Sequence, residues 1–291
     1  MAEDEENEQL VDAAARAAGV ITGRTRTVGI IGWPVAGSLS PAIHNAAFAA
    51  LGLDWTYVPL AVGPDSLLTA LAGLRALGFA GANVTMPHKE EAASACSTLS
   101  EDAALVRAVN TIVVGEAGLE GHNTDIPGFA RFLDQDAGFD PAGRSILVYG
   151  AGGAARACLV ALLRGGAAVV SLAARDPRKA EWIRDGSGKL EGEIRVIPWS
   201  EGGPTGVDLI VNATPVHGDL LPLPPLQAGQ VVIDLQYRPT VTPLVAMARR
   251  AGAAGFTGLG MLLHQAALSF ELWTGHVPPL DVMSAAALAE L

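Results

Sequence analysis

The lysine in the stretch 83–92, NVTMPHKEEA, stands where a structural lysine is unfavourable. Pro87 predicts the first position of a helix, because its fixed φ suits that position and its missing N–H costs nothing there. Lys89 then falls in the first turn, where the partial positive charge of the helix favours Glu90 and Glu91 and disfavours an ammonium group. A placement that is poor for a structural lysine suits a functional one, so Lys89 is a candidate functional residue. A solvated side chain is the alternative.

A second candidate site is the glycine-rich stretch 149–156, YGAGGAAR, which directly follows a strand-like run. In this context Gly150 makes a tight turn, Gly152 lets the backbone approach a pyrophosphate, and Ala155 lets the helix pack on the strand. The pattern predicts a dinucleotide site, with a plain glycine turn as the alternative.

The tip of the next strand, at residues 174–177, bears on the choice of dinucleotide. Arg175 and Lys179 suit the 2′-phosphate of NADP, whereas an acid at this tip usually binds the ribose of NAD. Asp176 followed by Pro177 also matches an N-cap and a first helical residue, and we favour that interpretation. NADP is therefore the expected cofactor, and NAD stays open.

Small polar residues are dense at the expected strand ends and loops of the N-terminal half. Each alone fits a cap or a turn. Together they suit a ligand with several hydroxyls and a carboxylate, if the fold brings them together. They are Ser38, Ser40, Asn83, Thr85, Asn110, Thr111, Asn123 and Asp125. Pro41 predicts an extended Ser40, because the residue before proline avoids the helical region.

Strand-like and helix-like runs alternate along most of the chain. The expected strands cover 27–32, 55–61, 79–85, 111–114, 119–122, 145–149, 167–173, 207–212, 230–235 and a run near 256. The expected helices cover 41–51, 64–77, 101–109, 126–136, 154–163, 243–251 and 261–273. The runs 111–114 and 119–122 suggest a short hairpin around residues 115–118. The alternation of strands and helices along the rest of the chain predicts parallel sheets with helices on their faces.

Composition excludes several classes of protein. The chain has 291 residues, half of them hydrophobic, which is enough for two modest domains. A net charge of −11 disfavours a nucleic-acid partner. No apolar run approaches the roughly 20 residues of a membrane span, and the acidic start is unlike a signal peptide. The expected location is the cytoplasm, with Cys96 and Cys158 as reduced thiols. The six histidines have no metal-ligand spacing, so no metal is expected, and His88 is expected to face solvent.

With these motifs in view, the chain resembles the shikimate dehydrogenases from about Val28 to Pro278. Many motifs match in order, which makes the resemblance specific. They are GWPVAGSLSPAIHN, GANVTMPHKEEA, AVNT, NTD, GAGGAAR, NAT at 212–214, DLQY at 234–237 and GLGMLLHQA at 258–266.

The resemblance implies a role for each matching residue. It implies the reversible, NADPH-dependent reduction of 3-dehydroshikimate to shikimate in aromatic amino acid biosynthesis, with Lys89 and Asp125 as the catalytic pair. The implied substrate-binding residues are Ser38, Ser40, Thr85, Asn110, Tyr237 and Gln265. The implied cofactor-binding residues are Gly150, Ala151, Gly152, Gly153, Ala154, Ala174, Arg175, Lys179, Thr214 and Gly258.

Two stretches depart from the family pattern. The usual Asn-Arg-Thr of the strand tip is Ala174-Arg175-Asp176 here, which loses one phosphate partner and adds a negative charge. The Gly-Met that commonly follows NATP is not matched in 212–219, which affects contacts near the nicotinamide. A quinate/shikimate dehydrogenase that uses NAD and a cofactor-binding regulator without turnover remain alternatives. Methylenetetrahydrofolate dehydrogenases are a more distant rival.

The expected architecture is two α/β domains with an active-site cleft between them, since domain interfaces commonly hold ligand sites. Residues 1–26 are expected to form a partly disordered N-terminal extension. Residues 27–125 with 260–291 should form the substrate-binding domain, and 126–259 the Rossmann dinucleotide-binding domain. The expected partner is a small-molecule substrate, with no membrane, and a homodimer is an allowed assembly.

Overall fold

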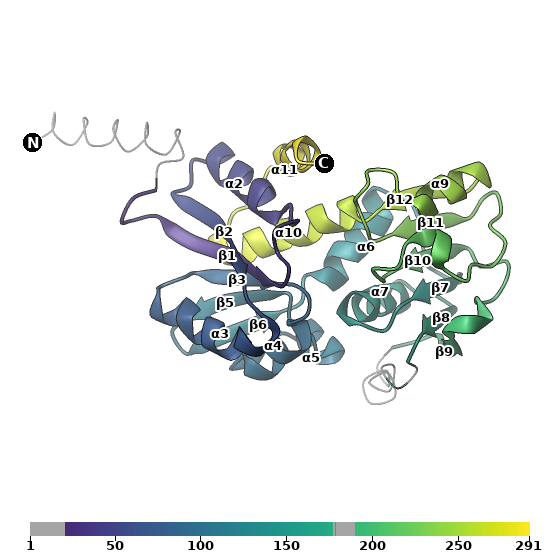
Figure 1. Ribbon diagram of the computed structural model, residues 1–291, viewed down its shortest axis with the longest axis horizontal. Helices are drawn as coiled ribbons and strands as arrows, with labels where there is room; N and C mark the ends of the chain where they lie inside the picture. Colours follow the sequence, from purple (N-terminus) through teal and green to yellow (C-terminus); the bar gives the residue numbers. More distant parts are fainter. Residues whose placement is uncertain (1–20, 177, 179–189) are drawn as a thin grey trace, which may run out of the picture. The chain divides into compact units, whose positions relative to one another are not determined.

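The protein forms two compact α/β units in a computed structural model that describes residues 21–176, 178 and 190–291 (Figure 1). Of the described residues, the first unit contains 21–103, Ala108–Asn123 and Ala266–Glu290. The second contains Ala104–Arg107 and the described part of Thr124–Gln265. Lys179, expected to bind the cofactor phosphate, lies outside the described residues.

The first unit is built on a six-stranded mixed sheet with the order β2-β1-β3-β5-β6-β4. Its strands are β1 (Arg26–Gly32), β2 (Trp55–Ala61), β3 (Gly81–Val84), β4 (Thr98–Leu99), β5 (Thr111–Gly115) and β6 (Gly118–His122). β1 pairs in parallel with β2 and β3, whereas β5 runs antiparallel to β3 and β6. The hairpin expected around residues 115–118 is confirmed by the pairing of β5 with β6. Two strands joined by so short a turn must be antiparallel, so this hairpin makes the sheet mixed, whereas the parallel pairing expected for the other strands holds for β1 with β2 and β3.

Helices cover both faces of this first sheet. They are α2 (Ser40–Ala50), α3 (Leu67–Ala76), α4 (Lys89–Ala95), the start of α5 (Glu101–Val106), the end of α10 (Leu259–Thr274) and α11 (Leu280–Ala289), with a 3₁₀ turn η1 (Pro64–Ser66) before α3. Leu71 of α3 and Ala92 of α4 share a buried cluster with Ile31 and Val84 of the sheet. On the other face, Phe48 of α2 stacks on Phe270 of α10. The alternation of side chains along β1 and β3 supplies both cores.

The second unit has a six-stranded sheet in which every pairing is parallel, as expected. Its strands are β7 (Ser145–Tyr149), β8 (Val169–Ala174), β9 (Glu193–Pro198), β10 (Leu209–Asn212), β11 (Val231–Asp234) and β12 (Ala254–Thr257). The order β9-β8-β7-β10-β11-β12 is the 3-2-1-4-5-6 order of dinucleotide-binding folds. Ligands of such sheets bind at the carboxyl edge where the order reverses, which is here between β7 and β10.

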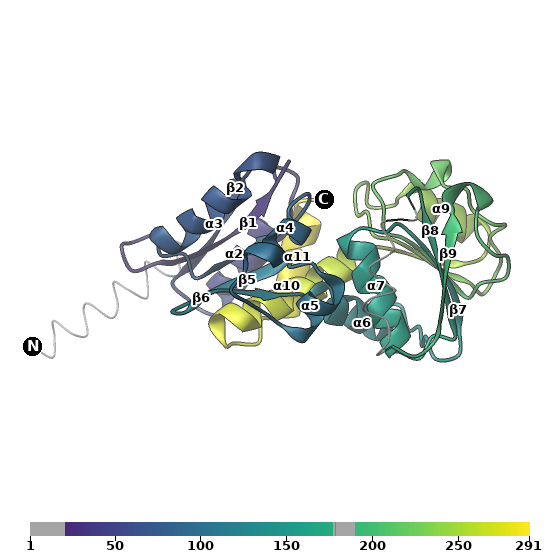
Figure 2. The same cartoon turned by 90° about the horizontal axis from the view of Figure 1, so that it is seen from below.

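Helices lie on both faces of the second sheet as well. They are α6 (Asp125–Gln135), α7 (Gly153–Arg164), α9 (Pro243–Arg250) and the start of α10, with 3₁₀ turns η4 (Trp199–Glu201) and η5 (Gly218–Leu220). α7 connects β7 to β8, and α9 connects β11 to β12, so the two connections advance across the sheet in opposite directions. Because both crossovers are right-handed, α7 and α9 lie on opposite faces. Figure 2 shows α6 beside α7 on one face of this sheet.

Strands β4 and β9 and helix α11 were not expected from the sequence. β9 is an edge strand with a charged, exposed pattern, and α11 is alanine-rich and packs against α2. Neither Cys96 nor Cys158 forms a disulfide with another residue that the structure describes. In the part of the chain that the structure describes, no helix is both long enough and apolar enough to cross a membrane.

Candidate active site

Lys89 is the first residue of α4, so its expected place in the first turn is confirmed. The expectation for Pro87 was wrong, because the helix begins only at Lys89 and Pro87 lies in the turn before it, after a cis peptide bond from Met86. The Lys89 carbonyl accepts a hydrogen bond of 2.9 Å from the N–H of Val109. This bond fixes the start of α4 beside the segment that leads into β5.

One edge of the first sheet gathers the residues that this unit was expected to contribute to the site. β1 and β3 are parallel neighbours, so both strands end at the same edge of the sheet. Ser38 and Ser40 come after β1, and Thr85 comes directly after β3, at this edge. β5 runs antiparallel to β3, so Asn110, just before β5, lies at that edge too. Lys89 follows Thr85 by one short turn. Five predicted residues from three separate segments therefore meet at one edge.

Gly32, at the end of β1, makes room for Thr85. A Cβ on Gly32 would collide with Cγ2 of Thr85. The Thr85 N–H also donates to the Ile31 carbonyl at 2.9 Å. A glycine at this position thus lets the ends of β1 and β3 approach closely.

The two serines of the GSLSP stretch are held differently. Ser40 is buried and already helical, so the extended conformation expected from Pro41 was wrong. The helix starts one residue before the proline, and the N-cap residue Leu39 has a helical backbone (φ −83°, ψ −12°). Ser38 is half-buried, and its Oγ accepts the Ser40 N–H at 3.2 Å. That bond satisfies one of the open N–H groups of the helix start.

His88 is buried, with 1% of its surface exposed, so the expectation that it faces solvent was wrong. Its Nε2 lies 2.7 Å from the Val62 carbonyl. Because a carbonyl only accepts, Nε2 carries the hydrogen of this bond. The side chain therefore ties the residue before Lys89 to the segment that follows β2.

His44 of α2 is a fully buried histidine that the sequence did not single out. Its ring stacks on Tyr57 with centroids 4.4 Å apart and packs against Phe270 and Trp273. Neither ring nitrogen has a hydrogen-bond partner among the residues that the structure describes. Burial lowers the pKa of His44 from 6.5 to about 3, so the ring is neutral in the native protein.

We expect the stability of the protein to fall with pH because of His44. Between pH 6.5 and about 3 the unfolded chain binds a proton that the native chain does not. The free energy of unfolding should thus decrease by about 1.4 kcal/mol for each pH unit lost in this window. Urea unfolding at several pH values measures the slope. His44→Leu should remove the part of the slope that comes from His44, and the control His276→Gln, at an exposed histidine, should leave the slope unchanged. Equal slopes in wild type and His44→Leu would contradict the assignment.

Asp125 in the second unit is buried at the first position of α6. An acid there is favoured by the helix dipole, and the N-cap position belongs to Thr124. Gln265 lies close by on α10, since a Cβ on Gly128 of α6 would come within 2.7 Å of the Gln265 Cβ. The Gln265 side chain donates to the Leu262 carbonyl at 2.9 Å. The structure thus brings Asp125 and Gln265 onto adjacent helices.

The glycine loop has the geometry expected for a dinucleotide site. Gly150 has a φ of +124°, which favours glycine, and a Cβ there would press on the Ala213 carbonyl. Gly152 is exposed, with open space where a Cβ would stand, and it is the N-cap of the twelve-residue helix α7. Ala155 is buried where α7 meets the sheet. An anion can therefore approach the backbone N–H groups at the helix start.

Arg156, just after this loop, is a buried residue whose role the sequence did not indicate. Its guanidinium donates to the Ala151 carbonyl at 3.4 Å and to the Val106 carbonyl at 3.2 Å. Both bonds hold the glycine loop in place. Its position next to the motif was the only signal in the sequence.

The tip of β8 places Arg175 at the carboxyl edge next to the glycine loop, since Tyr149 pairs with Ala173. Arg175 is exposed, with its guanidinium 6.0 Å from the centre of the Trp199 ring. The carboxylate of Asp176 accepts the backbone N–H of Arg178 at 3.1 Å and forms a two-pronged ion pair with the Arg178 guanidinium. The backbone bond is the contact expected of a capping aspartate. The ion pair also offsets the negative charge that distinguishes this tip.

The ends of β10, β11 and β12 bring the remaining expected residues to the same carboxyl edge. Thr214 follows β10 and donates to Asn212 at 2.7 Å, with its methyl group 3.2 Å from where a Gly150 Cβ would stand. Tyr237 follows β11, and burial raises its pKa. Gly258 follows β12, where a Cβ would collide with the Leu235 carbonyl. Thr214, Tyr237 and Gly258 therefore share an edge with the glycine loop.

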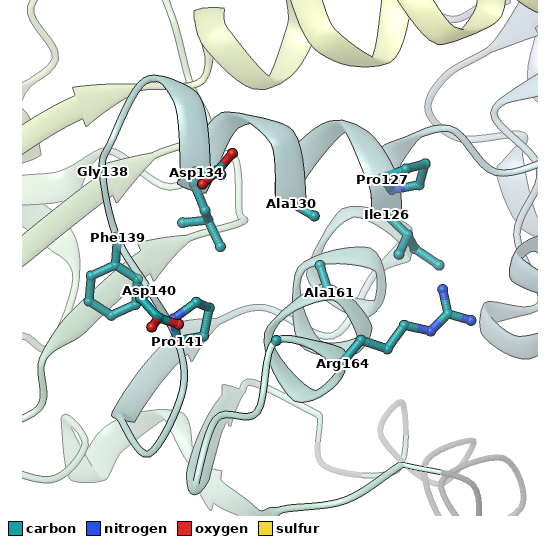
Figure 3. Close-up of a pocket in the computed structure, with 12 residues that line it drawn as sticks. Ile126, Pro127, Ala130, Asp134, Gly138, Phe139, Asp140, Pro141, Ala161 and Arg164 are labelled. Atoms are coloured by element: carbon teal, nitrogen blue, oxygen red, sulfur yellow. The ribbon is translucent and has the colours of Figure 1, made fainter.

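A pocket of about 670 Å³ lies elsewhere in the second unit, between α6, the 138–141 loop and the end of α7 (Figure 3). Its floor is apolar, and it carries exposed charges of both signs, with Arg164 at one end and Asp134 and Asp140 at the other. None of the expected site residues that the structure describes lines it. The mixed charges select no class of ligand, so the candidate site stays at the two sheet edges.

Comparison with known proteins identifies the family. Residues 30–112 match the shikimate dehydrogenase substrate binding domain, and residues 258–288 match the shikimate 5′-dehydrogenase C-terminal domain. A shikimate dehydrogenase (NADP(+)) of Geobacter metallireducens is 44% identical, over 93% of this chain and 99% of the relative.

Solved structures agree with this assignment. Shikimate 5-dehydrogenase of Thermus thermophilus, in complex with NADP(H) and shikimate, has a TM-score of 0.79 at 34% identity, over 92% of this chain and 100% of that chain. The 5-ketofructose reductase of a Gluconobacter strain has a TM-score of 0.81 at 33% identity, over 93% and 100%. The fold is thus shared by enzymes that differ in substrate.

Proposed function

The chain belongs to the shikimate dehydrogenase family, and from this premise we propose that it catalyses the reversible, NADPH-dependent reduction of 3-dehydroshikimate to shikimate. The observation that carries the proposal is the gathering of Lys89 with four small polar residues at one edge of the first sheet. Hydroxyl and amide groups beside a single cation suit a small molecule with a carboxylate and several hydroxyls. The reaction is a step of aromatic amino acid biosynthesis.

In this proposal the side chains divide the substrate between them. Ser38, Ser40, Thr85 and Tyr237 bind the carboxylate, and Asn110 and Gln265 bind ring hydroxyls. Lys89 takes the hydroxyl proton during oxidation and returns it to the developing alkoxide during reduction. The Asp125 carboxylate accepts a hydrogen bond from a substrate hydroxyl.

The carboxyl edge of the second sheet fits NADP. The cofactor, when bound, accepts the hydride from shikimate or supplies it to the ketone. The open start of α7 can hold the pyrophosphate, and Arg175 can pair with the 2′-phosphate. The proposed cofactor residues are Gly150, Ala151, Gly152, Gly153, Ala154, Ala174, Arg175, Lys179, Thr214 and Gly258.

Arg175→Ser should weaken the preference for NADP over NAD. One charge-assisted contact to the 2′-phosphate is lost, so kcat/KM with NADP should fall by roughly one to two powers of ten while kcat/KM with NAD changes little. Asp176 does not oppose this preference, because Arg178 engages its carboxylate. Steady-state kinetics with both cofactors measure the ratio.

Arg195→Ser is a matched control for Arg175, since Arg195 is an exposed arginine of the same sheet that pairs with Glu193. It should leave the ratio unchanged. A wild type that prefers NAD, with no response to Arg175→Ser, would contradict the assignment. It would favour a quinate/shikimate dehydrogenase that uses NAD.

We also propose that the protein acts in the cytoplasm. A homodimer is the assembly we propose to test by analytical ultracentrifugation. The experiment that tests the function itself is an assay of the purified chain with shikimate and NADP, in which the absorbance of NADPH is followed. Turnover supports the proposal. Binding of NADP without turnover would instead support a regulator.

A further inference from the structure

A buried hydrogen-bond network in the first unit links three strands to the end of α10. Asn83 of β3 lies at its centre, and its Oδ1 accepts a bond of 2.8 Å from the hydroxyl of Tyr57. The Asn83 Nδ2 lies 3.0 Å from both Thr111 Oγ1 and Ser269 Oγ, and 3.1 Å from the backbone carbonyl of Asn110. All five side chains are buried.

The partners of Asn83 fix the orientation of its amide. A backbone carbonyl can only accept, so the group that faces Asn110 must be Nδ2. Oδ1 consequently faces Tyr57, which must donate. Burial raises the pKa of Tyr57 well above its ordinary value, so the hydroxyl keeps the proton that this bond requires.

Thr111 connects the Asn83 amide to the side chain of Asn110 through hydrogen bonds. Its Oγ1 accepts from Asn83, lies 2.8 Å from the hydroxyl of Ser269, and donates to Oδ1 of Asn110 at 3.2 Å. When Ser269 donates to Thr111, the one hydrogen of Thr111 is directed at Asn110. Because Oδ1 of Asn110 faces Thr111, the Nδ2 group of the same amide lies on the side away from the network.

We propose that Thr111 is a positioning residue that fixes the Asn110 amide so that its Nδ2 donates to a ring hydroxyl of the substrate. The inference rests on the proposed function, because it concerns the substrate role of Asn110. A substrate hydroxyl has one hydrogen. Once the hydroxyl donates that hydrogen to a carboxylate or amine of the site, its oxygen can only accept, so any further hydrogen bond must come from a donor of the protein. The orientation set by Thr111 supplies such a donor.

Thr111→Val removes the hydroxyl and keeps the shape of the side chain, so it tests the proposal directly. The Asn110 amide loses the bond that orients it, and the KM for shikimate should rise about tenfold. The kcat should change by no more than about twofold, because the groups that move the proton and the hydride are untouched. Steady-state kinetics at saturating NADP give both constants.

Three further variants separate positioning from general loosening. Thr111→Ser restores the hydroxyl and should return KM close to the wild-type value. Thr56→Val, a matched change in β2, should leave KM unchanged. Ser269→Ala acts on Thr111 one step further from the substrate and should raise KM by a smaller factor. It also keeps the proposal testable if Thr111→Val does not fold.

The decisive measurement is a double-mutant cycle between Thr111→Val and Asn110→Ala. If Thr111 acts through Asn110, the valine adds no further rise in KM in the Asn110→Ala background. An additive rise, or an unchanged KM in Thr111→Val, would overturn the inference while leaving an active wild type and the proposed function in place. A wild type that does not oxidise shikimate would overturn both.

Discussion

Lys89→Ala should lower the kcat of shikimate oxidation by about 10²–10⁴-fold, the usual cost of losing a positioned proton-transfer group. Lys89 is the first residue of α4 and lies at the sheet edge where the small polar residues gather. Its backbone bond to Val109 and the buried side chain of His88 hold the start of this helix in place. The glycine loop is untouched, so the Kd for NADP should stay within about twofold of wild type. Stopped-flow or steady-state kinetics and a binding titration measure the two quantities.

Glu91→Ala is the matched control, because Glu91 is exposed in the same first turn of α4. It should retain nearly wild-type kcat. A Lys89→Ala enzyme with wild-type kcat would return Lys89 to a solvated surface role. A parallel loss of NADP binding would indicate a damaged fold, which a thermal melt distinguishes from lost chemistry.

Replacing Ser38 and Ser40 together by alanine should raise the KM for shikimate by roughly 10²–10⁴-fold, with a much smaller effect on kcat. Each serine is proposed to bond the substrate carboxylate, and a bond to a charged group contributes about 1.5–3 kcal/mol. The Ser38 Oγ also accepts the Ser40 N–H, so the two single variants should not add up to the double one.

Ser66→Ala provides the comparison for the serine pair, since Ser66 is an exposed serine of the same unit. Its KM should equal that of the wild type. An unchanged KM in the double variant would assign both serines to the structure of the α2 start alone. Loss of kcat with an unchanged KM would likewise contradict their role in substrate binding.

Local patterns predicted much of this fold. The run TVGIIG predicted β1, and the run WTYVPLA matched the bounds of β2. The glycine loop predicted the β7–α7 junction because strand, loop and helix are contiguous in the sequence. Thr85 and Thr214 directly follow strands, so their place at a carboxyl edge can be predicted once the strands are assigned to a sheet.

Other features depend on contacts that no local pattern carries. β9 has exposed charged residues and forms only because β8 offers it an open edge. His88 looked polar and solvated, yet the Val62 carbonyl gives it a buried partner. Ser269 lies far along the chain from Asn83, so its place in the buried network could not be predicted from spacing.

The proposed activity is tested most directly by comparing shikimate and quinate, each with NADP and with NAD, as substrates of the wild-type protein. Initial rates of nicotinamide reduction give four values of kcat/KM. We expect the highest value for shikimate with NADP, and a lower value when either the substrate or the cofactor is exchanged. Equal or faster oxidation of quinate with NAD, or tight binding of NADP with no turnover of either substrate, would contradict the proposed activity.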